Sequence, residues 1–128
     1  MRRRVQKVNP LVHKVALNNL RQRVVDMRIQ MLMMDDGEYC ATHVLLLNQQ
    51  LTVLSLALEA RQMQDSEPHQ ALAAALSVFR ACAECGFKWN KADAMVIDHA
   101  LGVFLEWTGK LPVAELVEST RKMLAAST

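Results

Sequence analysis

Aromatic residues, glycine and proline are scarce in this chain. Aromatic residues make up 5% of its 128 residues, and it contains four glycines and three prolines. Runs of β-branched residues are also few, so long stretches remain uninterrupted by residues that oppose a helix. This composition predicts helices throughout. Neither a glycine-rich phosphate loop nor an H-E-x-x-H pair is present, and no serine stands in a catalytic motif. We therefore expect a protein that is not an enzyme and that uses no cofactor and no small-molecule substrate.

Cysteine is also scarce, and its count of three is odd. The basic amino terminus is not followed by the apolar segment of a signal peptide, which favours free thiols and a cytoplasmic location. No charged residue occurs between Tyr39 and Leu58, a stretch long enough to span a membrane. Three consecutive amides, Asn48-Gln49-Gln50, would be costly in hydrocarbon. We therefore expect a buried central helix and no membrane partner.

Capping residues and breakers divide the chain into five predicted helices. The expected bounds are Pro10 to Asp35-Asp36-Gly37, Glu38 to Gln64, Ser66 to Gly86, Asn90 to Gly109, and Pro112 to the carboxyl end, with Asn9, Ser66 and Asn90 as amino-terminal caps and Asp93 completing a capping box. Because the connections are short, neighbouring helices should be antiparallel. The sequence predicts an all-α fold: a compact antiparallel bundle of four long helices plus a short C-terminal helix. Residues 10–128 should form one helical domain, preceded by a basic arm, residues 1–9, that need not be ordered.

Positive charge is concentrated at the beginning of the chain. Residues 1–28 hold eight Lys and Arg residues and one acid, whereas the remaining residues carry a net charge of −5. Lys7, Lys14, Arg21 and Arg28 stand seven residues apart, so the last three should form one stripe along a helix. This asymmetry indicates an acidic protein surface or a polyanion as the partner.

An apolar seam runs beside the basic stripe. It comprises Leu17, Leu20, Val24, Met27, Met31 and Met34, which alternate steps of three and four residues as in a heptad repeat. We expect the rear of this helix to be the more deeply buried part, because past Val24 the apolar face widens to include Val25, Ile29, Leu32 and Met33. We interpret the chain as a non-enzymatic regulator or adaptor whose partner is another protein, or a second copy in a homodimer. The predicted contact residues are Lys14, Leu17, Leu20, Arg21, Val24, Met27 and Arg28.

A helix-turn-helix is the alternative, with DNA as the partner. Gly86 would be the turn glycine, and Ala92 and Met95 would anchor the second helix. The residues that would contact nucleic acid are Arg2, Arg3, Arg4 and Lys7 of the arm together with Lys88, Asn90 and Lys91.

Two pairs with metal-ligand spacing also occur. Cys40 and His43, and Cys82 and Cys85, could together supply a zinc site with three thiolates and one imidazole. However, a Cys-x-x-His pair within a helix replaces half of a zinc knuckle poorly, and free cysteines are often buried packing residues. We expect packing and no metal, with zinc as the alternative.

Overall fold

The computed structural model describes residues 10–32, 37–38, 41–84, 86 and 88–126. Its helices are α1 (Pro10–Leu32), α2 (Ala41–Ala60), α3 (Glu67–Glu84), α4 (Lys91–Lys110) and α5 (Val113–Ala126). Two short strands, β1 (Gly37–Glu38) and β2 (Lys88–Trp89), pair antiparallel, with Gly37 opposite Trp89. The predicted all-α bundle with four long helices and a short C-terminal helix is confirmed.

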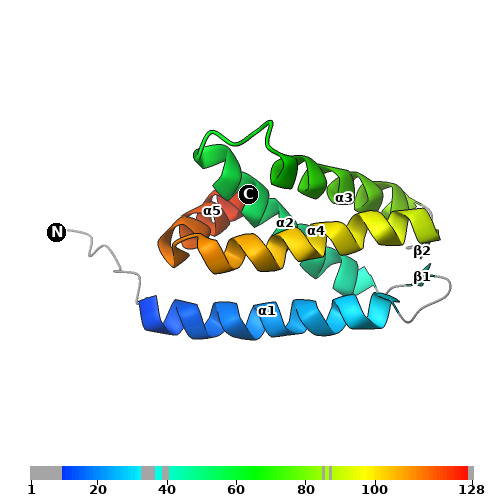
Figure 1. Ribbon diagram of the computed structural model, residues 1–128, viewed down its shortest axis with the longest axis horizontal. Coiled ribbons are helices and arrows are strands. Elements are labelled where there is room, and N and C mark those ends of the chain that lie inside the picture. The colour runs from blue at the N-terminus through cyan, green and yellow to red at the C-terminus, as the bar shows by residue number, and fades with distance from the viewer. Residues whose placement is uncertain (1–9, 33–36, 39–40, 85, 87, 127–128) are drawn as a thin grey trace.

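Helices α2 and α4 are central, and α1, α3 and α5 pack around them. Helix α4 has α3 along one side and α1 along the other, while α2 packs on α3 and α5 (Figure 1). Helix α1 contacts mainly α4 and, at its amino-terminal end, α5. It is therefore a peripheral helix that closes one side of the bundle.

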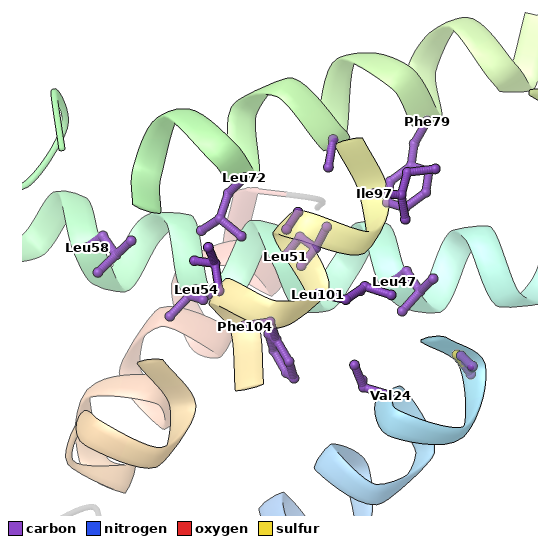
Figure 2. Packing of buried hydrophobic residues seen from close by; sticks show 14 of the residues in the cluster. Val24, Leu47, Leu51, Leu54, Leu58, Leu72, Phe79, Ile97, Leu101 and Phe104 are labelled. Atoms are coloured by element: carbon purple, nitrogen blue, oxygen red, sulfur yellow. The ribbon is translucent and has the colours of Figure 1, made fainter. Parts of the chain in front are cut away.

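Helix α2 forms the centre of the core, as the sequence predicts. Side chains spaced by four and three residues along α2 are almost completely buried, and they meet apolar side chains of α3 and α4 (Figure 2). The α2 residues concerned are Leu47, Leu51, Leu54 and Leu58. One buried cluster includes side chains from all five helices. Among the described helices, none is both long enough and apolar enough to cross a membrane.

The predicted caps of α3 and α4 are confirmed. Ser66 Oγ accepts a hydrogen bond from the His69 amide at 3.4 Å, and Asn90 Oδ1 accepts one from the Asp93 amide at 2.9 Å. The Asn90 amide in turn donates to Asp93 Oδ2 at 3.4 Å, which completes the capping box. Gly86 has φ +75°, a backbone conformation that favours glycine.

Helix α2 ends four residues before its predicted end at Gln64. The Gln62 amide donates to the Glu59 carbonyl and the Met63 amide to the Leu58 carbonyl, both at 3.0 Å. This pair of bonds is a Schellman turn, which requires a left-handed residue, and Gln62 occupies that position with φ +62°. Sequence reasoning missed this end because glycine is the usual residue there. The predicted cap of α1, Asn9, lies outside the described residues. So do residues 33–36, which include most of the predicted end of this helix.

Candidate partner-binding site on the amino-terminal helix

Two arginines of the predicted basic stripe attach α1 to α4. Arg28 Nε donates to Asp98 Oδ1 at 2.6 Å, and its Nη2 donates to Asp98 Oδ2 at 3.4 Å. Arg21 Nη2 donates to the Leu105 carbonyl at 2.7 Å. Since residue 28 meets residue 98 and residue 21 meets residue 105, the two helices are antiparallel. Both guanidinium groups therefore make contacts within the chain.

Two glycines of α4 make room for these arginines. A Cβ atom on Gly102 would lie 3.3 Å from Arg28 Nη2, and one on Gly109 would lie 3.3 Å from Arg21 Nη2. The seven-residue spacing of the glycines equals that of the arginines, so one row fits against the other. This matching spacing is the signal in the sequence that is consistent with α4 as the neighbour of the stripe.

The seam residues Val24 and Met27 are covered by the protein itself, whereas Met34 and the side chain of Met31 lie outside the described residues. Val24 is 1% exposed and Met27 is 6% exposed, and both belong to the buried cluster. Burial of two such side chains stabilises the docked helix by about 3–6 kcal/mol. A partner would therefore have to displace much of α1 to reach them. Val24 and Met27 are thus closed to a partner. Arg21 and Arg28 are engaged with α4 and remain only partly exposed. The expected burial of Ile29 is wrong, because its side chain is 53% exposed, and Val25 is only half-buried. Met33 and the side chain of Leu32 lie outside the described residues.

The front of the seam lines a cavity. Leu17 and Leu20 are half-buried and face a space of about 120 Å³ that opens to solvent between α1, α2, α4 and α5. Most of the other lining side chains are apolar, among them Val53, Phe104 and Val117. The arrangement can therefore accept an apolar group that approaches along α1.

Lys14 is an unpaired cation near this cavity, because it directly follows the lining residue His13 and lies three residues before Leu17 on α1. It continues the row of Arg21 and Arg28 by one further step of seven residues, but α4 ends at Lys110 and offers no glycine at that level. Its side chain is exposed and has no ion-pair partner within the described part of the chain. Of the seven predicted contact residues, the structure thus leaves Lys14, Leu17 and Leu20 at an open surface.

The predicted helix-turn-helix register does not fit the structure. Ala92 and Met95 should anchor the second helix, but Ala92 is exposed and Met95 is 73% exposed. Ile97 and Leu101, both fully buried, anchor α4 instead. The error arises because α4 packs along α3 for much of its length. The buried residues of α4 are therefore those that face α3, and Ala92 and Met95 are not among them.

The other predicted nucleic-acid contacts are only partly described. Asn90 is engaged as the helix cap, whereas Lys91 is exposed. Arg2, Arg3, Arg4, Lys7 and the side chain of Lys88 lie outside the described residues.

The zinc alternative stays a prediction. Cys40 and Cys85 lie outside the described residues, while His43 is half-buried and Cys82 is 3% exposed. No group of three metal-ligating side chains occurs among the residues that the structure does describe. The ladder between β1 and β2 pairs residues near Cys40 in sequence with residues near Cys85.

A serine, a histidine and a glutamate meet between α2 and α3, which sequence reasoning did not foresee. His69 Nε2 lies 3.2 Å from Ser55 Oγ and 3.5 Å from Glu59 Oε1. Both oxygens approach the same ring nitrogen, so these contacts provide no relay through the imidazole from the carboxylate to the hydroxyl. Ser55 is also 9% exposed. The cluster therefore serves packing between the two helices, and the cavity beside Lys14 is the stronger candidate site.

Comparison with protein-family models, curated proteins and solved structures finds no match for this chain.

Proposed function

We propose that this protein is a non-enzymatic regulator or adaptor that binds another protein through the amino-terminal half of α1. The observation that supports this function best is the combination of an apolar cavity, walled by Leu17 and Leu20, with the unpaired cation Lys14 at its side. The partner would insert one apolar side chain and place an acidic residue near Lys14.

The size of the cavity sets the size of the inserted group. Apolar cavities of about 150 Å³ in proteins stay dry and accept a molecule as large as benzene. A space of about 120 Å³ therefore suits a single leucine, methionine or phenylalanine side chain. Such a buried anchor is the usual centre of an interface hot spot.

The cation supplies orientation and not most of the affinity. Exposed ion pairs contribute about 0.2–1 kcal/mol, whereas a buried apolar side chain contributes about 1.5–3 kcal/mol. Complementary charge at the rim mainly accelerates association and excludes partners of the wrong sign. Binding should thus depend on the cavity first and on Lys14 second.

Affinity capture from the native host, followed by titration with the captured partner, tests this function. Val117→Phe, which fills the cavity from α5 and leaves α1 unchanged, should weaken binding at least about tenfold. Lys14→Glu should weaken it about fivefold. Arg23→Glu is the matched control, because Arg23 is an exposed cation on the same helix, away from the cavity lining. Circular dichroism melts should show that all three variants fold.

If Lys14→Glu and Arg23→Glu weaken binding equally, the partner is attracted by the general positive charge of α1, and Lys14 has no specific role. Full binding by Val117→Phe would refute the anchor. Solution mass measured at increasing concentration shows whether the partner is a second copy. Binding to random DNA that falls steeply between two salt concentrations would replace this proposal with the nucleic-acid alternative, because phosphate contacts release counterions.

A further inference from the structure

A second open surface lies on α2 and α3, away from the lining of the cavity on α1. It is a groove of about 350 Å³ between the two helices. Its walls are formed by residues 44–52 of α2 and residues 76–83 of α3. Each stretch is about two helical turns long, so the groove extends roughly 12 Å along the helices.

The floor of this groove is apolar. Val44 and Phe79 are 4% and 2% exposed, and Leu76 is half-buried above them. At one edge Leu45 is 59% exposed, although the rest of α2 supplies the centre of the core. An apolar side chain of a partner, seated on this floor, would also cover Leu45. Removing the leucine from water in this way would contribute to binding.

The polar groups of the groove select for negative charge. Arg80 is the only ionisable residue among those that line it. Its side chain is exposed and forms no ion pair with any described residue, including Glu84 one turn further along α3. The Asn48 side chain also has no hydrogen-bond partner in the described part of the chain. Thr52 Oγ1, in contrast, already donates to the Asn48 carbonyl at 2.7 Å.

From these features we propose that the α2–α3 groove binds an amphipathic peptide helix that carries an acidic residue. Its apolar side chains would cover the floor and Leu45, and its carboxylate would accept hydrogen bonds from Arg80. The groove is open, so one face of its occupant stays in water, as it does for an amphipathic helix and not for an acyl chain or a compact apolar molecule. The basic helix α1 of a second copy does not fit, because it would bring like charge to Arg80.

This proposal is independent of the site on α1, because the two surfaces share no lining residue. If both hold, the protein carries two separate binding surfaces, which an adaptor needs in order to join two partners.

The test uses the full chain, labelled with ¹⁵N, and a synthetic helix-forming peptide of about fourteen residues. The peptide carries leucines at steps of three and four residues and glutamates on either side of them, and a matched peptide carries lysines in place of the glutamates. Titrations are followed by amide chemical shifts and by fluorescence anisotropy of a labelled peptide. The glutamate peptide should bind and shift the amides of Leu45, Asn48 and Arg80, while the lysine peptide should bind at least about fivefold more weakly.

Variants locate the contact. Arg80→Glu should weaken the glutamate peptide about fivefold, and added salt should reduce that difference. Leu45→Ala should weaken both peptides about fivefold to tenfold. Leu124→Ala is the matched control for Leu45, because Leu124 is 57% exposed on another helix. Lys14→Glu tests the other site and should leave binding of the glutamate peptide within twofold.

The proposal is overturned if the two peptides bind equally tightly, if Arg80→Glu leaves the affinity unchanged, or if the shifts map to the cavity beside α1. Absence of binding of the glutamate peptide at millimolar concentration also overturns it. None of these results depends on the proposed partner of α1, so each surface can fail alone.

Discussion

Replacing Val24 by alanine should loosen α1 far more than the same replacement at Val15. Both valines are on α1, but Val24 is 1% exposed and lies in the core, whereas Val15 is 53% exposed. Val24→Ala removes two buried methyl groups, which lowers the free energy of unfolding by about 1.6 kcal/mol through lost apolar burial. The void that remains adds about 1 kcal/mol. The higher helix propensity of alanine offsets about 0.5 kcal/mol of this loss, so the total loss is about 2 kcal/mol.

Val15→Ala serves as the control because it makes the same chemical change in the same helix. Alanine favours a helix over valine by about 0.5 kcal/mol, and this gain offsets the small loss of partly exposed surface. We therefore expect a change within about 0.5 kcal/mol for Val15→Ala. For a chain of 128 residues, 2 kcal/mol corresponds to a fall in Tm of about 7 °C.

Urea denaturation gives the two free energies, and amide hydrogen exchange locates the change. Because α1 packs mainly on α4 and α5, its amides should lose protection in Val24→Ala before those of α2 do. If Val24→Ala and Val15→Ala differ by less than about 0.5 kcal/mol, α1 is not docked through Val24. Val24 and Met27 would then be open to a partner after all.

Three further predictions concern single positions. Gln62→Gly should raise the free energy of unfolding by about 0.5–1 kcal/mol in urea titrations, because glycine adopts the left-handed conformation of residue 62 without steric strain; an unchanged or lower value would exclude that strain. Asn90→Ala should lower it by about 1 kcal/mol through loss of the capping bonds of α4, whereas the exposed Asn19→Ala on α1 should not lower it. Hydrogen bonds from Arg61 to Glu115, at 2.7 and 2.6 Å, hold the pKa of Glu115 below its ordinary value. A carboxyl group with a lowered folded-state pKa stabilises the protein above the unfolded pKa and loses this contribution as pH falls through the folded pKa. Glu115→Gln should therefore flatten the acid side of the stability–pH profile below about pH 5, and an unchanged profile would show that the pair contributes nothing.

The local sequence determined most of the secondary structure. Ser66, and Asn90 with Asp93, marked where helices begin, because a side chain that caps free amides acts within one turn of the chain. The uncharged stretch from Tyr39 to Leu58 marked the central helix, because a helix that is apolar on nearly every side has no face suited to water. Where a local rule was broken, as at Gln62 in place of glycine, the predicted helix end was wrong.

Only the tertiary structure decided which face of α1 is free. The seam and the basic stripe are periodic features of the sequence, but a periodic face does not specify what covers it. Gly102 and Gly109 of α4 receive Arg28 and Arg21, and this pairing depends on contacts between residues seventy or more positions apart. The same packing leaves Lys14 beyond the end of α4, next to a cavity that Leu17 and Leu20 share with α5. The sequence supplied these residues, and the antiparallel packing of two helices determined which of them remain open to a partner.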